Sequence, residues 1–117
     1  MILHQIKHKE TGTVLGTRVE VATSMVRRTV GLMFRPEMGE IDGLMVERCN
    51  SVHTCFQRFP MDVVFLSRDY TIVKIIRSMK TWRFTWMYWR AVRALELPAG
   101  SVPAIVIEGG KLEVTRV

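Results

Sequence analysis

Short apolar segments of strand length, each followed by turn residues, recur along this 117-residue chain. The segment Met61-Asp-Val-Val-Phe-Leu66 is nearly continuous in apolar residues, which is typical of a central strand buried on both faces. Other segments alternate apolar with polar residues or are rich in β-branched residues. The pattern predicts strands at residues 2–8, 18–22, 43–48, 61–66, 71–76, 91–97, 103–107 and 112–117.

One segment has helical spacing instead. Apolar residues recur from Met25 to Met33, and Thr23 or Ser24 offers an N-cap, so we expect a short helix over residues 24–33. The sequence therefore predicts a mainly β fold, a compact β sandwich or barrel of about seven or more strands with one short helical insertion. An α+β sheet is the alternative.

Length and composition set the class of protein. The chain is 48% apolar and 24% charged, which is typical of a globular protein, and its length predicts a single domain over residues 1–117. Charge interrupts the N-terminal segment too early for a signal peptide, and no apolar run of about eighteen residues predicts a membrane span. Two cysteines, Cys49 and Cys55, are few for a disulfide framework. We therefore expect a cytoplasmic protein with reduced thiols.

The net charge of +6 raises the question of an anionic partner. Residues 77–90 mix basic side chains with aromatic rings, as single-stranded nucleic-acid platforms do. However, Trp82, Phe84 and Trp86 also alternate like the inward face of a strand, which favours a core role. Because no nucleic-acid motif accompanies the charge, nucleic-acid binding is the less favoured interpretation.

Ionisable groups gather just before the central strand. Asp62 lies one residue inside it, where arginines or backbone donors must hold the carboxylate ionised. Arg28, Arg35 and Arg58 are the candidate partners. Either they form a structural ion pair with Asp62, or they converge on a pocket for a small anion, since guanidinium groups suit carboxylate and phosphate.

A second carboxylate, Glu96, points to the opposite face from Leu95 and Leu97 if residues 91–97 form a strand. It would then be solvated or line a pocket. Together with Asp62 and His53 it could supply a general acid and base, which is the basis of an enzymatic alternative. No nucleophile elbow, phosphate loop or metal motif supports catalysis, so the sequence favours a non-catalytic role.

Cys49, His53 and Cys55 have the parity to share one strand face, and thiolates with imidazole suit zinc. Their spacing does not match a zinc knuckle, and a fourth ligand is not evident. A Cys55 nucleophile beside His53 would require a bend in the backbone. We therefore predict neither a metal nor any other cofactor and expect the cysteines to act as packing groups.

Three motifs in order carry a family resemblance: Arg28-Thr-Val-Gly-Leu-Met-Phe-Arg35, Phe59-Pro-Met-Asp-Val-Val-Phe-Leu66 and Leu95-Glu-Leu-Pro-Ala-Gly100. Together they resemble the family catalogued as domain of unknown function 192, and the similarity runs from about residue 19 to the C-terminus. Val52-His-Thr54 and Trp82-Arg83 resemble further elements of one branch. Gln57 stands where the family pattern favours methionine, and Glu108-Gly-Gly110 replaces a Gly-Asp turn. The resemblance implies a small, mainly β fold and no established activity.

We therefore expect a domain that binds a small anionic ligand or an acidic protein surface. The predicted site residues are Arg28, Arg35, His53, Arg58, Asp62 and Glu96. A small hydrolase-like enzyme using the same cluster is the first alternative, and single-stranded nucleic-acid binding through residues 77–90 is the second. The sequence predicts no oligomeric state. The prediction requires that these side chains, distant along the chain, meet at one mouth of the β fold.

Overall fold

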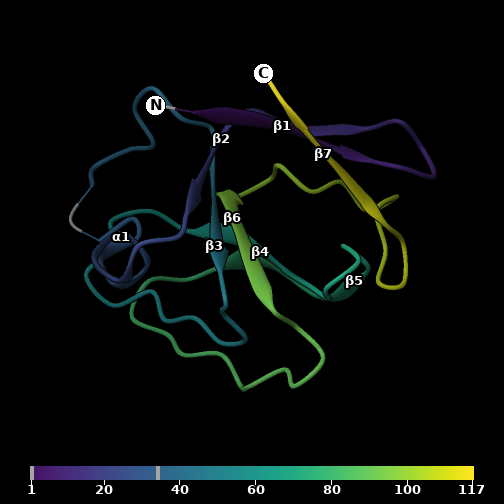
Figure 1. The fold of residues 1–117 in the computed structure, drawn as a ribbon. Helices are drawn as coiled ribbons and strands as arrows, with labels where there is room; N and C mark the ends of the chain where they lie inside the picture. The colour runs from purple at the N-terminus through teal and green to yellow at the C-terminus, as the bar shows by residue number, and fades with distance from the viewer. Residues whose placement is uncertain (1, 34) are drawn as a thin grey trace.

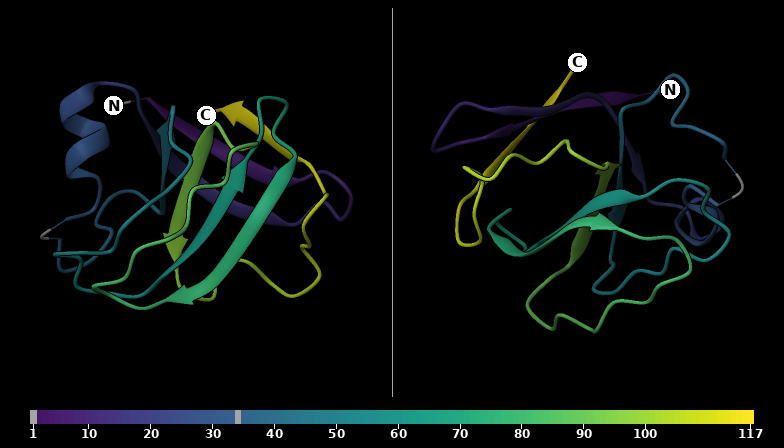
Figure 2. Two further views of the ribbon diagram at one scale, coloured as in Figure 1. Left: turned by 90° about the horizontal axis from the view of Figure 1, so that it is seen from below. Right: turned by 180° about the vertical axis from the view of Figure 1, so that it is seen from behind.

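The seven strands found in the described residues, 2–33 and 35–117 of a computed structural model, form one curled sheet. Met1 and Phe34, the latter part of the first family motif, lie outside those residues. The strands are β1 (Leu3–His8), β2 (Val14–Ala22), β3 (Gly43–Glu47), β4 (Met61–Leu66), β5 (Ile72–Met79), β6 (Arg93–Pro98) and β7 (Leu112–Arg116). Their order in the sheet is β5-β4-β6-β3-β2-β1-β7. The sheet curls into a half-barrel, which confirms the predicted mainly β fold (Figures 1 and 2).

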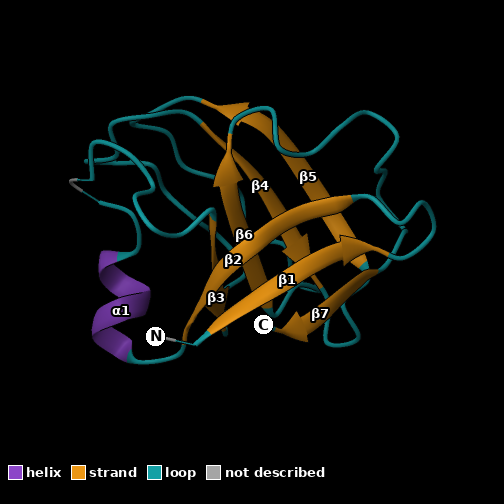
Figure 3. Ribbon diagram, turned by 90° about the horizontal axis from the view of Figure 1, so that it is seen from above, coloured by secondary structure: helices purple, strands orange, loops and turns teal. Residues whose placement is uncertain are grey.

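Most neighbouring strands are antiparallel. The exception is β2 with β3, which pair in parallel because the chain crosses over between them through residues 23–42. That crossover contains α1 (Met25–Val30), which stands beside one end of the sheet (Figure 3). The two edge strands of the sheet are β5 and β7. Thr71 and Lys111 form an isolated bridge between the two edges, and the Leu112 amide donates to the Tyr70 carbonyl at 3.0 Å.

Helix α1 is shorter than the predicted segment 24–33. Ser24 caps its N-terminus by accepting a hydrogen bond from the Arg27 amide at 3.1 Å. Gly31 ends it with φ of 53°, a conformation that glycine adopts without steric cost. None of the residues of α1 is buried, and Met25 and Val26 are exposed. Polar contacts of its arginines, such as the ion pair of Arg27 with the Glu20 carboxylate, therefore hold the helix instead of an apolar face.

The sheet is covered on both faces. One cluster of buried residues takes side chains from all seven described strands, including Ile6, Val64, Leu95 and Leu97, and fills the inside of the curl. Two smaller clusters lie on the outer face. One packs under residues 32–41 and includes Leu44, and the other, around Phe65, packs under the loops at residues 49–52 and 88–91. Neither outer cluster contains a residue of α1 (Met25–Val30), so irregular chain forms the cover over both.

The predicted strand at residues 103–107 is wrong. This segment forms turns, in which the Val106 amide donates to the Pro103 carbonyl at 3.0 Å. Val106 is fully buried in the inner cluster, so its apolar character reflects packing and not strand pairing. Arg77 of β5 holds the segment by donating to the carbonyls of Val102, Pro103 and Val106. Within the described residues, no helix is long and apolar enough to cross a membrane.

Asp62 is buried at the start of β4, and backbone donors satisfy its carboxylate. Oδ1 accepts from the Ser78 amide at 2.8 Å, and Oδ2 accepts from the Val102 amide at 2.9 Å. Ser78 has φ of 52° next to a register shift between β4 and β5. The carboxylate therefore joins an irregular part of β5 to the loop after β6. Its partners are backbone amides, and not Arg28, Arg35 or Arg58.

Replacing Asp62 with asparagine should destabilise the fold. An asparagine side chain has one acceptor oxygen and would present an NH2 group to one of the two amides, so a buried donor would lose its partner. We expect the free energy of unfolding to fall by about 1–3 kcal/mol. Urea denaturation measures this, with Glu37→Gln at an exposed position as the matched control. Equal stability of Asp62→Asn and wild type would contradict this role.

Candidate functional site

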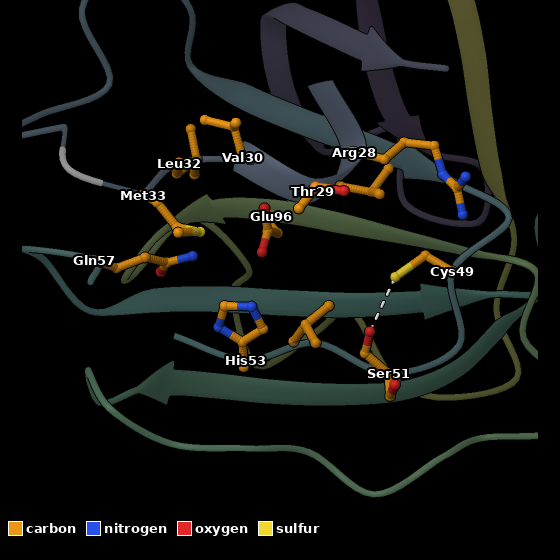
Figure 4. A pocket seen from close by; sticks show the side chains of 13 residues that line it. Arg28, Thr29, Val30, Leu32, Met33, Cys49, Ser51, His53, Gln57 and Glu96 are labelled. Carbon is orange, nitrogen blue, oxygen red and sulfur yellow. Dashed lines mark hydrogen bonds between the residues drawn. The ribbon is translucent and has the colours of Figure 1, made fainter. Parts of the chain in front are cut away.

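A cavity of about 80 Å³ lies on the outer face of the sheet, between the end of α1 and the segment 49–57. Its floor is formed by Val46 of β3 and Glu96 of β6, and residues 28–33 form one wall. The opposite wall comes from Cys49, Ser51, Val52, His53 and Gln57. Figure 4 shows Glu96 between these walls, with Gln57 and Met33 on one side of it and Cys49 on the other.

Glu96 is the charged group at the centre of the cavity. It pairs with Leu44 of β3 and Val63 of β4, and it points to the outer face while Leu95 and Leu97 join the inner cluster. Only 4% of the residue is exposed. Burial raises the pKa of its carboxyl from the ordinary value of 4.5 to about 7, although a hydrogen bond from Gln57 and the charge of Arg27 oppose the rise. Near neutral pH the carboxyl is therefore partly protonated.

Gln57 brings an amide to the same cavity. The side chain is buried and points toward Glu96 (Figure 4). Its NH2 group interacts with the Glu96 carboxyl by a hydrogen bond. Its carbonyl oxygen, Oε1, is buried without a hydrogen-bond partner among the described residues. Gln57 was not a predicted site residue. The signal for it was its departure from the methionine that the family pattern favours, because an amide at an apolar position needs partners.

His53 stands at the exposed side of the cavity. Its Nδ1 accepts a hydrogen bond from the Cys55 amide at 3.2 Å, so a neutral ring carries its proton on Nε2. The ring points into the cavity from the side opposite α1 (Figure 4). Its backbone forms an isolated bridge with Phe84. His53 therefore offers a donor at the mouth of the cavity.

The predicted arginines do not gather around a common ligand. Arg28 lines the cavity, but it donates to the carbonyls of Glu47 and Arg48, both at 2.8 Å, and so fixes the turn after β3. Arg35 lies in a separate hollow formed by residues 35–41, where it donates to the Met38 carbonyl at 3.3 Å. Arg58 is exposed, and Asp62 lies on the inner side of the sheet. Of the six predicted residues, the described cavity thus brings together Arg28, His53 and Glu96.

The two cysteines are free thiols. Cys49 lines the cavity and donates to the Ser51 carbonyl at 3.0 Å (Figure 4). Burial raises the pKa of its thiol, which disfavours the reactive thiolate. Within the described residues, no group of three His, Cys, Asp or Glu side chains could hold a metal ion.

The aromatic residues that alternate after β5 lie outside the core. Trp82, Phe84 and Trp86 are all exposed, so the core interpretation of these rings is wrong. The buried Thr54 explains why they do not fold inward: its amide donates to the Arg83 carbonyl at 2.8 Å, and its hydroxyl oxygen accepts from the Arg83 amide at 2.8 Å. Their backbone is therefore held beside segment 49–57 with the rings directed to solvent.

Comparisons with known proteins agree with this fold. The DUF192 family model, described as "Uncharacterized ACR", matches residues 6–114. A UPF0127 protein of Pyrococcus furiosus is 36% identical over 109 residues, which cover 90% of this chain and 93% of the relative.

Two solved structures share the fold, each with a TM-score of 0.79. A protein of unknown function from Novosphingobium aromaticivorans is 21% identical, and the match covers 96% of this chain and 84% of that one. A Sinorhizobium meliloti protein described as a "putative transcription regulator" is 24% identical, with 97% and 92% coverage. At these identities the likeness concerns the fold alone.

The raised pKa of Glu96 predicts how stability varies with pH. Because the folded state holds a proton that the unfolded state releases between about pH 4.5 and 7, the free energy of unfolding should fall as pH rises through this range. By about pH 8 the loss from this group should be on the order of 3 kcal/mol. Glu96→Gln cannot ionise, so it should lack this fall and gain stability relative to wild type at the higher pH.

Urea denaturation at a series of pH values measures this difference. The matched control is Glu113→Gln, at an exposed position of β7, which should follow the wild-type curve. If Glu96→Gln and wild type showed the same dependence on pH, the assigned pKa shift would be refuted.

Proposed function

Because this chain belongs to the DUF192 family, which is described as uncharacterised, we propose a function from its own cavity: binding of a small neutral group that donates hydrogen bonds. An amide or a hydroxyl group at the end of a larger molecule has this chemistry. Glu96 and Gln57 would accept its hydrogen bonds, and His53 would donate to it. We also propose that residues 1–117 act as one domain, in a reducing compartment such as the cytoplasm that suits its two thiols.

The unpartnered oxygen of Gln57 is the observation that carries this proposal. A buried carbonyl oxygen without a hydrogen bond costs about 1–3 kcal/mol, so native proteins rarely keep one unless water or a ligand satisfies it. The oxygen belongs to a side chain that lines an open cavity and lies beside the buried carboxyl of Glu96. A donor entering this cavity would meet two acceptors already in place.

The geometry favours a neutral group over the anion expected from the sequence. An anion would be repelled by the ionised form of Glu96. Two guanidinium nitrogens of Arg28 already donate to backbone carbonyls. A cation would be attracted to the carboxylate but would lie near Arg27, whose charge already acts on Glu96. A neutral donor is compatible with both protonation states of the carboxyl.

The size of the cavity limits what enters it. A dry cavity of about 150 Å³ accepts benzene in other proteins, so the 80 Å³ found here suits a group of only a few non-hydrogen atoms. The rest of the ligand would lie outside, over the exposed His53. The proposed ligand is therefore recognised by one polar end.

Acid–base catalysis at the same cavity is the second candidate. It is favoured by the pKa of Glu96, about 7, because a general acid or base is most effective when its pKa lies near the working pH. The half-buried thiol of Cys49, with its raised pKa, is a poor nucleophile, so any reaction would have to use water. An enzyme would lose turnover in Glu96→Gln while keeping its fold, whereas a binding domain would show no turnover to lose.

Three small molecules of one shape and different charge test the proposed ligand class. Acetamide, acetate and acetamidinium are nearly isosteric, and NMR shifts of the Gln57 side-chain amide and the His53 ring would report binding. We expect acetamide to bind with a dissociation constant on the order of millimolar, and acetate to bind more weakly wherever it is ionised. Acetamidinium should bind more tightly as pH rises through about 7, where Glu96 ionises.

Two variants sharpen the test. Gln57→Met removes the acceptor with little change in volume and should weaken acetamide binding about five-fold or more. Arg58→Ala, outside the cavity, should leave it unchanged. If acetate bound most tightly of the three, or if Arg58→Ala abolished binding, the results would favour the anionic ligand that the sequence predicts. Unchanged acetamide binding by Gln57→Met would refute the role of the amide.

A further inference from the structure

Residues 80–90, named here the aromatic loop, expose an unusual amount of apolar surface. Phe84, Trp86 and Trp89 are exposed at 78%, 80% and 76%, and Trp82 and Met87 are also exposed. Isolated exposed apolar residues are normal, but several in succession mark a surface that binds something. All three tryptophans of the chain lie in this loop.

The loop is held in place by hydrogen bonds to the segment that lines the cavity. The Thr85 amide donates to the Val52 carbonyl at 2.9 Å, and the Tyr88 amide donates to the Asn50 carbonyl at 2.9 Å. The Thr85 hydroxyl accepts from the Val52 amide at 2.9 Å. The rings therefore project from a fixed backbone, which reduces the entropy that binding would cost.

The charge of the loop is of one sign. It carries Lys80, Arg83 and Arg90, and no acidic residue occurs between positions 70 and 95. Among the described residues, none of the five ion pairs involves these three side chains. The loop thus combines unpaired positive charge with projecting aromatic rings.

We propose that the aromatic loop binds the surface of an anionic lipid bilayer. Tryptophan and phenylalanine rings are favourable at the boundary between headgroups and acyl chains, and basic side chains are attracted to anionic headgroups. Met87, an aliphatic side chain on the same loop, also fits an apolar boundary. The loop would lie on the bilayer without spanning it.

The exposure of the rings favours a bilayer over single-stranded nucleic acid. A base stacks on one face of an aromatic ring, so stacking does not require that the rest of the ring be exposed. Phe84, Trp86 and Trp89 are exposed at 78%, 80% and 76% and project into solvent. Projecting rings enter a soft boundary more readily than they support stacked bases.

Intrinsic fluorescence offers a direct test because every tryptophan lies in the loop. The full chain is titrated with phosphatidylcholine vesicles that contain phosphatidylserine, and with vesicles of phosphatidylcholine alone. We expect a blue shift and cosedimentation with the anionic vesicles. Binding to the neutral vesicles should be on the order of 100-fold weaker, since each of three basic residues contributes about five-fold. High salt should weaken the anionic binding.

Matched variants separate the loop from general stickiness. Trp86→Ser and Trp89→Ser should each weaken cosedimentation about ten-fold, and Arg83→Gln about five-fold. Met25→Ser removes an equally exposed apolar side chain from α1 and should have no effect. Because the substituted side chains are exposed, these variants should keep the wild-type fold, and thermal melting checks this.

Three results would overturn the proposal. The first is the absence of a blue shift and of cosedimentation with anionic vesicles. The second is a fluorescence change with single-stranded oligothymidine, dependent on Trp86 and Arg83, when vesicles give none; this would assign the loop to nucleic acid. The third is a blue shift that depends on protein concentration without lipid, which would assign the loop to contact between copies of the chain.

Discussion

Burial of strand β6 on both faces is the constraint on which the rest of this structure depends. Leu95 and Leu97 face the inside of the curled sheet, so the residue between them must face outward. That outward residue is Glu96, and the chain covers it with α1 and segment 49–57 instead of leaving it in water. Because this cover is irregular, it closes incompletely, and a cavity remains above the carboxyl. The site is thus a product of how a two-sided sheet is covered.

The basic composition of the chain has a structural explanation in part. Several guanidinium groups donate to backbone carbonyls of loops that lack strand partners: Arg28 serves the turn after β3, and Arg77 serves the segment after β6. Arg93 serves the turn between β4 and β5 in the same way and also pairs with Glu47. Buried carbonyl groups need hydrogen-bond donors, and the long connections of this small β fold have few backbone amides available for them. Lys80, Arg83 and Arg90 of the aromatic loop take part in none of the five ion pairs of the described residues.

The sequence was informative where periodicity decides the structure and uninformative where loop paths decide it. Alternation in residues 91–97 predicts that Glu96 faces away from its leucine neighbours, and the strand has this geometry. The same rule failed for Trp82 and Trp86, because hydrogen bonds between Thr54 and Arg83 hold this part of the backbone outside the sheet, and no local pattern reports such a distant partner. Convergence of arginines at one mouth likewise depended on where Arg35 is placed by an irregular crossover. Periodicity fixes a side chain's face but not the course of a loop.

The contact between the sheet's two edges has a consequence for how copies of the chain behave in concentrated solution. An open edge strand offers unpaired amides and carbonyls to any passing chain, which is a common start of aggregation. Here the Thr71–Lys111 bridge and the hydrogen bond from Leu112 to Tyr70 bring the beginning of β5 against the beginning of β7. Some backbone amides and carbonyls next to each edge strand therefore already form hydrogen bonds with the other edge. The curl of the sheet thus limits the template that either border offers for fibril growth.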